Sequence, residues 1–289
     1  MSVTVPKRPL VGLSRGGNEA RVSGAGELEV RPSVLEDLSD YVVFLVLEGE
    51  GRGLASGIEA SATQRESLSG LVLIDPSTPS DQGHPHELFK ESLEAGRRAP
   101  MYLVPVVRSH ELFDGQVRDR FLTRVFTLHR WRQTCGDMPS VAQLQGFHAA
   151  NKSLFTAHDE SSTRALGRSI ASCGSSEVSD LAHEYIIQVM RILDRPAGRG
   201  AHVNVLQHVL GHFRGTLDQS TREALHEMLR DYAQGQVPLA AVREVLFGHA
   251  RAVGSEWLRN QTYLAPYPLE QGSPYPAGGS LESVRGACA

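Results

Sequence analysis

The hydrophobic pattern of this sequence changes once, near residue 115, and that change constrains the fold more than any other feature. Before it, short apolar runs are separated by Gly, Ser and Pro, and stretches with helical spacing lie between them. After it, apolar residues recur at helical spacing almost without interruption to about residue 260. Strands that alternate with helices are typical of an α/β layer with a mainly parallel sheet. We therefore predict an α/β N-terminal domain followed by an all-α helical bundle domain.

The expected elements follow from this pattern. Four apolar runs predict strands at residues 8–13, 40–47, 71–74 and 101–107. Helical spacing between these runs predicts two helices, at residues 31–38 and 86–95. In the second half the clearest helices are expected at residues 181–193, 202–213, 220–232 and 239–250. Ser220 with Glu223 three residues later predicts a capping box. Residues 260–268 contain two prolines and are expected to pack as an extended arm over the bundle.

Composition sets the domain count and the class of protein. The 289 residues are 40% hydrophobic and 21% charged, which is typical of globular chains. We predict an α/β domain at residues 1–117, a helical domain at 118–270 and a disordered tail at 271–289, where Gly, Pro and Ser are enriched.

Charge and cysteine content predict the setting. The net charge is −4, which is not the signature of a nucleic-acid-binding protein, and no apolar run has the length of a membrane span. The chain has three cysteines, too few for a disulfide framework, so we expect a cytoplasmic protein. The oligomeric state is not indicated by the sequence.

Local signatures of catalysis and metal binding are weak. No phosphate-binding glycine motif occurs, and Gly16-Gly17 is interpreted as an ordinary turn. His208 and His212 are four residues apart and would share one helix face, which suits two metal ligands, but no third ligand is indicated. We therefore predict no catalytic residue, no metal and no cofactor.

Polar residues stand beside apolar positions on several predicted helices. Buried polar groups are costly unless they find partners. One hypothesis is a shared pocket for an anionic or nucleobase-like ligand, and the other is a set of hydrogen bonds that fix the bundle. The residues concerned are His148, Asn151, Lys152, Arg199, His202, Asn204 and His208.

Five motifs in the second half resemble the YbgA-like helical domain, a family of unknown function. They occur in order over residues 116–270 and begin at Phe147-His148, Arg164, Arg199, Tyr232 and Leu258. Asn151 departs from the family pattern, which often has histidine there. His212 also departs, since an aromatic residue is usual. The candidate ligand-binding set, extended by these motifs, is His148, Asn151, Lys152, His158, Arg199, His202, Asn204, His208, Asn260, Gln261 and Tyr263.

The first part of the chain resembles a TudS-like domain, the thiouracil desulfurase type that uses an iron–sulfur cluster. The resemblance rests on the opening run Pro9-Leu10-Val11-Gly12-Leu13-Ser14 and on the joining segment from Arg118 to Arg132. The family's cluster needs cysteine thiolates, and no cysteine precedes Cys135. The resemblance therefore implies a degenerate TudS-like domain without a cluster.

These observations leave two functional hypotheses open. The first is a non-catalytic binding or accessory protein whose helical domain holds a nucleobase, nucleotide or other anionic ligand. The alternative is an enzyme that acts on a (thio)nucleobase-like substrate through acid–base residues of the helical domain, namely His148, Lys152, His158, His202 and His208.

Overall fold

A computed structural model describes residues 12–14, 43–48, 68–74, 103–108, 111, 114–136, 138–174 and 177–267. The chain divides into two units, Met1–Arg130 and Trp131–Ala289, and each is described by itself. The predicted helices at 31–38 and 86–95 and the predicted tail at 271–289 lie outside the described residues. The predicted domain bounds stay a prediction.

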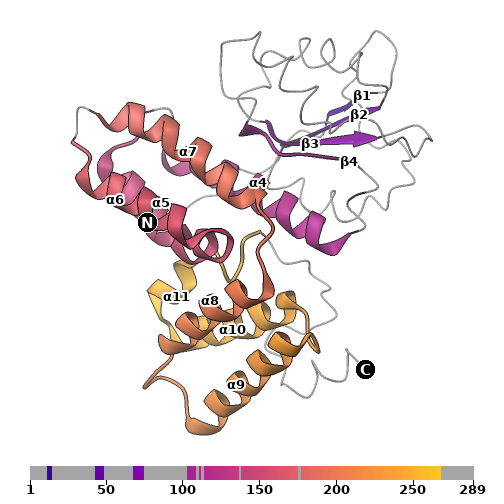
Figure 1. Ribbon diagram of the computed structural model, residues 1–289, viewed down its shortest axis with the longest axis vertical. Helices are drawn as coiled ribbons and strands as arrows, with labels where there is room; N and C mark the ends of the chain where they lie inside the picture. The colour runs from indigo at the N-terminus through magenta and orange to yellow at the C-terminus, as the bar shows by residue number, and fades with distance from the viewer. Residues whose placement is uncertain are drawn as a thin grey trace. The chain divides into compact units, whose positions relative to one another are not determined.

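The described part of the first unit contains a small parallel sheet. Its strands are β1 (Gly12–Ser14), β2 (Val43–Glu48), β3 (Leu68–Ile74) and β4 (Val106–Arg108), hydrogen-bonded in the order β1-β2-β3-β4 (Figure 1). Every neighbouring pair is parallel, for example with Leu13 opposite Val46 and Leu47 opposite Leu73. These strands fall on or beside the four predicted runs. The complete α/β domain stays a prediction, because the connections between the strands are not among the described residues.

Helix α4 (Gly115–Thr134) contains the division between the two units. Four apolar residues at helical spacing are buried, namely Phe121, Val125, Leu128 and Trp131. Residues 121–128 are all buried, so α4 is enclosed on every side over two turns rather than along one stripe.

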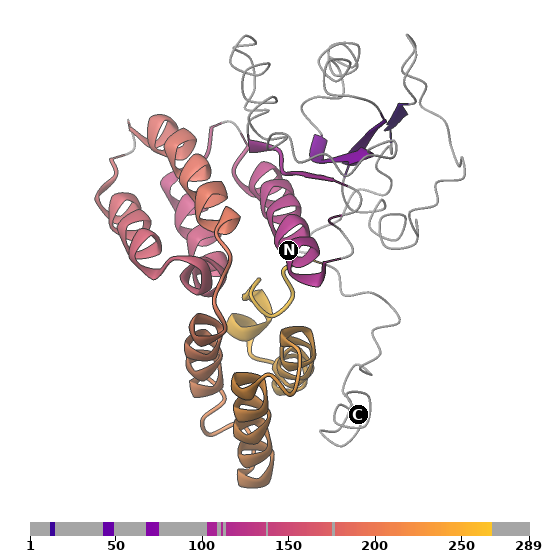
Figure 2. The same ribbon diagram turned by 45° about the vertical axis from the view of Figure 1, so that its right-hand side comes forward.

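The second unit is all helical where it is described, which confirms the predicted bundle. Helices α5 (Val141–His158), α6 (Glu160–Ser172) and α7 (Val178–Asp194) pack against one another as a first group (Figures 1 and 2). The second group contains α8 (Arg199–Gly211), α9 (Gln219–Gln234), α10 (Leu239–Val253) and the short α11 (Glu256–Asn260). Packing of α8 on α5 joins the groups, and the link 195–198 connects them along the chain.

Side-chain caps explain where several helices begin. Ser140 and Gln143 form a capping box at α5, and the Gln143 side chain also donates to the Thr134 carbonyl at 2.7 Å. The capping box predicted at Ser220 and Glu223 is wrong. Asp218 is the N-cap of α9 and accepts from the Thr221 amide at 2.8 Å, because this carboxylate directly precedes the first helical residue and its charge favours the helix N-terminus.

An aromatic cluster forms the core of the first group. The Trp131 ring stacks on Tyr185 with centroids 5.6 Å apart, and the edge of Phe147 meets it at 5.2 Å. Tyr185 and Phe155 are fully buried beside them. The cluster holds α5 and α7 to the end of α4 and so fixes the helices that carry the candidate residues.

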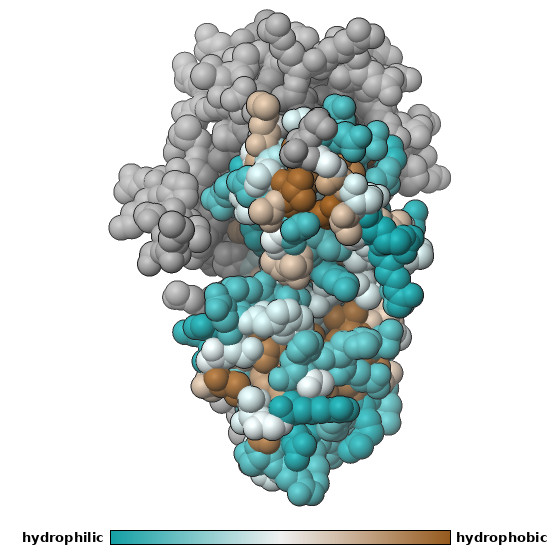
Figure 3. Space-filling model, turned by 90° about the vertical axis from the view of Figure 1, so that its left-hand side faces the viewer, coloured by the Kyte–Doolittle hydropathy of each residue, from teal (hydrophilic) through white to brown (hydrophobic). Residues whose placement is uncertain are grey.

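Hydrophilic residues predominate on the face of the described helices shown in Figure 3. On the face in Figure 3, hydrophobic residues are exposed only in small groups between hydrophilic ones. Within the described ranges, no helix combines the length and the apolar character that a membrane span requires.

Candidate functional site

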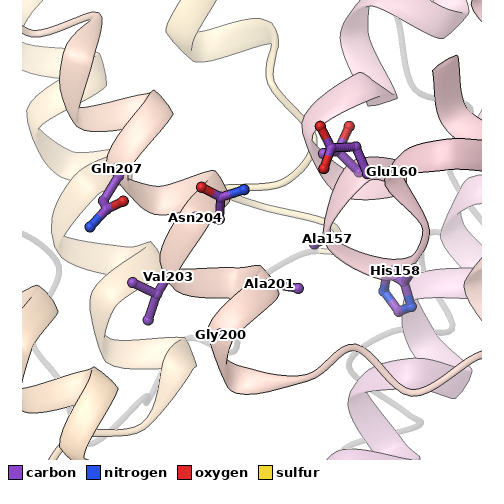
Figure 4. Close-up of a pocket in the computed structure, with 9 residues that line it drawn as sticks. Ala157, His158, Glu160, Gly200, Ala201, Val203, Asn204 and Gln207 are labelled. Carbon is purple, nitrogen blue, oxygen red and sulfur yellow. The ribbon is translucent and has the colours of Figure 1, made fainter.

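A pocket of about 470 Å³ opens between the α5–α6 corner and the first three turns of α8 (Figure 4). Its volume lies in the range of small-molecule sites. Asn204 and Glu160 point into the same space from opposite sides, and His158 lies at the α5 end (Figure 4). The nine lining residues come from these two elements and are Thr156, Ala157, His158, Glu160, Gly200, Ala201, Val203, Asn204 and Gln207.

The α5–α6 wall of this pocket is fixed by contacts to the α7–α8 link. The Nδ1 atom of His158 lies 2.7 Å from the carbonyl oxygen of Arg195. Since a carbonyl can only accept, Nδ1 carries the proton in this contact. The Arg195 guanidinium forms an ion pair with Asp159, which also caps α6 through the Ser162 amide. Hydrogen bonds from Ser162 and Ser161, with a smaller effect of Arg195, lower the pKa of Asp159 to about 2.

The α8 wall is polar but contains little side-chain bulk at its start. Gly200 and Ala201 occupy the first turn, and Gly198 precedes the helix as an N-cap without a side-chain hydrogen bond. Asn204 and Gln207 follow three residues apart and therefore share one helix face. Small residues leave the space, and the two carboxamides supply donors and acceptors at its edge.

Buried aromatic groups lie behind His158. The His202 ring meets His158 edge-on with centroids 6.4 Å apart, and its Nδ1 lies 3.1 Å from the Tyr263 hydroxyl. The guanidinium of Arg243 covers the Tyr263 ring at 4.7 Å. His202 and Tyr263 are both buried, so they support the pocket wall from behind and do not line the pocket.

His148 belongs to a second, separate network. Its Nδ1 lies 3.0 Å from the Tyr185 hydroxyl, and Gly167 of α6 passes so close that an added Cβ would be 3.2 Å from Nε2. Burial, with the charge of Lys152 as a smaller cause, lowers the pKa of His148. Burial also raises the pKa of Tyr185 well above its usual value. Both rings are therefore neutral near pH 7 and act as a buried hydrogen-bonded pair.

Asn151 and Gln261 hold the C-terminal segment of the bundle against α5. Asn151 donates to the Phe147 carbonyl at 2.8 Å and accepts from the Thr262 hydroxyl at 2.8 Å. Gln261 accepts from Ser153 and donates to the Ala149 carbonyl. The arm predicted at 260–268 does pack over the bundle, but it forms turns after α11 rather than an extended strand.

The seven polar residues of the helical motifs do not share one environment. Three of them, His148, Asn151 and His202, are buried and hydrogen-bonded. The other four, Lys152, Arg199, Asn204 and His208, lie on outer helix faces and are exposed to solvent. Asn260 is exposed as well.

Among the eleven candidates, His158 and Asn204 line the pocket described above. Arg199 instead donates to the Tyr232 carbonyl at 2.8 Å, at the end of α9. Ligand binding at the eleven residues stays a prediction. Sequence reasoning missed Thr156, Glu160 and Gln207, of which Gln207 could have been found from its spacing to Asn204.

The expected His208/His212 pair does not form on one helix face. Helix α8 ends at Gly211, and His212 is the C-cap residue. Its ring stacks on the exposed Trp257 with centroids 3.7 Å apart. Helix α8 does not continue through His212 because residues 212–216 form turns, in which Gly215 has a positive φ of 82°.

Cys135 has structural surroundings. Cys135 is buried beside the Gln143 carbonyl, and burial raises its pKa to about 11, so its thiol is protonated at neutral pH. Within the described ranges, no three His, Cys, Asp or Glu side chains gather as metal ligands would.

Comparison with known proteins finds two matches. Residues 152–268 match the model of a family described as Protein of unknown function (DUF1722). The chain is also similar to the uncharacterized protein YbgA of Escherichia coli (strain K12), with 29% identity over 151 residues that cover 52% of this chain and 89% of that protein. No solved structure matches. The two matches support a YbgA-like helical domain of unknown function.

Proposed function

We propose that this chain is a non-catalytic binding or accessory protein, and that the pocket between the α5–α6 corner and α8 takes a nucleobase-like small molecule. The observation that carries the proposal is the polar lining of a cavity of about 470 Å³, with His158, Asn204 and Gln207 at its edge. Planar heterocycles use the same mixture of donors and acceptors that an imidazole and two carboxamides offer.

The charge of the lining favours the nucleobase over the anionic ligands also considered from the sequence. Glu160 is the acidic residue among the nine, and none of the nine is Lys or Arg. A phosphate or carboxylate would meet a like charge without a basic partner in the lining, which is unfavourable. A neutral heterocycle avoids that cost.

Dispersal of the acid–base residues supports a binding role over the enzyme alternative. His148 and His202 are buried and each is bonded to a tyrosine, whereas Lys152 and His208 are exposed. Of the five residues considered for acid–base chemistry, His158 lines the pocket. A reaction would need at least two such groups within reach of one substrate.

The test is calorimetric titration of the full chain with adenine, hypoxanthine, cytosine and uracil. We expect at least one base to bind, and Ala201→Leu to abolish that binding by filling the pocket. Ala233→Leu, on the exposed face of α9, is the matched control and should bind as the parent does. Equal binding by Ala201→Leu and the parent would place the ligand elsewhere, and no binding at all would refute the function.

We infer further that the N-terminal part is a degenerate TudS-like domain that holds no iron–sulfur cluster. What supports this is the lack of any cysteine before Cys135. We expect iron and sulfide analysis after anaerobic reconstitution to give neither element in stoichiometric amount. A cluster that is lost on replacing Cys135 or Cys173 would contradict the inference.

A further inference from the structure

We propose that the ligand of this pocket is a ribonucleoside, bound with its base along α8 and its ribose hydroxyls at Glu160. The inference rests on the proposed function and specifies the class of ligand. Two observations carry it, namely the size of the pocket and the presence of one carboxylate in a lining that contains no Lys or Arg.

The pocket is larger than a free base requires. At about 30 Å³ per non-hydrogen atom, which is the share of a water molecule in the liquid, the ten such atoms of adenine need about 300 Å³. This figure is an upper bound, because bonded atoms lie closer together than water molecules do. The pocket has a volume of about 470 Å³ and follows α8 from Gly200 to Gln207, a rise of about 10 Å. A sugar ring attached to the base would fill the remaining space.

Glu160 suits the hydroxyl groups of a sugar. Its side chain points into the pocket in Figure 4, and a carboxylate accepts hydrogen bonds through two oxygens. The ion pair with Arg164, one turn along α6, engages Oε1, so a hydroxyl can donate to the carboxylate without breaking that pair. In dinucleotide-binding folds an Asp or Glu accepts from a ribose hydroxyl in the same way.

The remaining polar groups match the two halves of a nucleoside. Thr156, on the same side as Glu160, carries a hydroxyl that both donates and accepts, as a sugar hydroxyl does. On the opposite side, Asn204 and Gln207 each offer a carboxamide, whose donor and acceptor suit the edge of a base. Val203 lies on α8 between these groups and supplies apolar contact for a ring.

The same charge distribution disfavours a nucleotide. A 5′-phosphate would add negative charge to a ligand whose sugar lies against Glu160, and no Lys or Arg lines the pocket to compensate it. A ribonucleoside has the hydroxyls that a carboxylate binds and carries no charge of its own.

The test is calorimetric titration of the full chain with adenosine, inosine, cytidine and uridine, each beside its 2′-deoxy form, its 5′-monophosphate and its free base. For at least one of the four we expect the ribonucleoside to bind at least about tenfold more tightly than the 2′-deoxy form, because the latter lacks one hydrogen bond to a charged group. The 5′-monophosphate and the free base should both bind more weakly than that ribonucleoside.

Glu160→Ala should reduce the preference for ribose over 2′-deoxyribose to within about threefold, because the acceptor is gone. The ratio of the two affinities is the decisive quantity, since a general loss of fit affects both ligands alike. Glu160→Gln keeps one accepting oxygen without the charge and should give an intermediate ratio. Glu184→Ala removes the same charge at an exposed position of α7 and should leave the parental ratio intact.

Three outcomes overturn the inference. They are equal binding of the ribose and 2′-deoxyribose forms by the parent, a parental ratio in both Glu160 variants, and a 5′-monophosphate that binds as tightly as its nucleoside. In each of them the proposed function survives, because a ligand that contains the base still binds. Absence of binding by every base and every nucleoside refutes both.

Discussion

At the scale of single residues, the close approach of Gly167 to His148 makes glycine necessary in the middle of α6. A Cβ at this position would lie 3.2 Å from Nε2, and the ring cannot give way because it is buried and bonded to Tyr185. We expect Gly167→Ala to lower the free energy of unfolding by about 1 kcal/mol, since overpacking outweighs the gain in helix propensity. Denaturant titration measures this change.

Gly146→Ala in α5 is the control for that substitution. An added Cβ there meets nothing within 4 Å, so the helix propensity acts alone and the variant should be more stable by up to about 1 kcal/mol. A stabilised Gly167→Ala would show that His148 moves freely, contrary to the packing described here.

The lowered pKa of His148 makes stability depend on pH in one direction. Burial is the larger cause and Lys152 the smaller, and both disfavour the charged ring in the folded state. The unfolded chain therefore binds more protons below the ordinary pKa of about 6.5, and stability falls as the pH drops from there toward the folded-state pKa. Lys152→Met removes the smaller cause, raises the folded-state pKa and should make that fall shallower.

The measurement is the free energy of unfolding at pH 7 and pH 5 for the parent and the variant. At pH 7 we expect Lys152→Met to lie within about 0.5 kcal/mol of the parent, because Lys152 is exposed. The pKa of His249 is also lowered by burial, but it contributes equally to both proteins. Arg222→Met removes an exposed charge on α9 and should show the same change of unfolding free energy between pH 7 and pH 5 as the parent. If the free energy of unfolding of Lys152→Met changed with pH as much as that of the parent, the effect of Lys152 on the pKa of His148 would be contradicted.

At the scale of elements, the start of α8 is tied to the end of α9 by Arg199. Its Nη1 donates to the Tyr232 carbonyl at 2.8 Å, and the guanidinium covers the Tyr232 ring at 5.5 Å. Gly235 ends α9 with φ of 84°, and a Cβ there would lie 2.7 Å from Nη1. Gly235→Ala should therefore cost the strain of a left-handed residue, about 1–2 kcal/mol, and also displace Arg199.

Gly254→Ala separates the backbone strain from the displacement of Arg199. Gly254 ends α10 with φ of 72° and has open space around its Cα, so alanine there brings backbone strain alone. We expect Gly235→Ala to be the more destabilising by about 0.5–1.5 kcal/mol in thermal or denaturant unfolding, which is the contribution of one hydrogen bond. In an Arg199→Ala background the difference should vanish. If it persists there, another group than Arg199 limits the space.

The sequence predicted these helices well but not their caps or the position of their polar residues. Helical spacing located α7 to α10 within about four residues, because burial repeats every turn over many residues. A helix is capped by a single side chain. Asp218 and Ser220 are both suitable N-cap residues for α9, and the hydrophobic spacing does not distinguish between them. Asn204 is exposed while His202, two residues earlier, is buried, and this difference depends on which helices pack alongside. The pocket could not be predicted, because Glu160 and Asn204 come to line one space only through tertiary packing.

At the scale of the whole described unit, the segment after α11 closes the bundle. Tyr263 and Leu264 are fully buried, and the Thr262 amide donates to the Ala150 carbonyl at 3.1 Å. Each such buried apolar side chain contributes about 1.5–3 kcal/mol. The segment contacts α5 through its polar groups and α8 through the Tyr263 hydroxyl on His202, so it holds the two helix groups together.

Two truncations therefore separate what the fold requires from what it does not. A chain that ends at Asn260 loses the buried segment and should lose several kcal/mol, which is a large part of the stability of an ordinary domain, so cooperative unfolding should fail. A chain that ends at Glu270 keeps the segment and lacks only the tail whose composition predicts disorder, so its melting temperature should stay within about 2 °C of the parent. Tyr263→Phe is the milder variant and, by removing only the hydroxyl on His202, should cost about 1 kcal/mol. Differential scanning calorimetry of the four proteins decides the matter: a cooperative transition at the parental temperature in the Asn260 truncation would show that the two helix groups hold together without this segment.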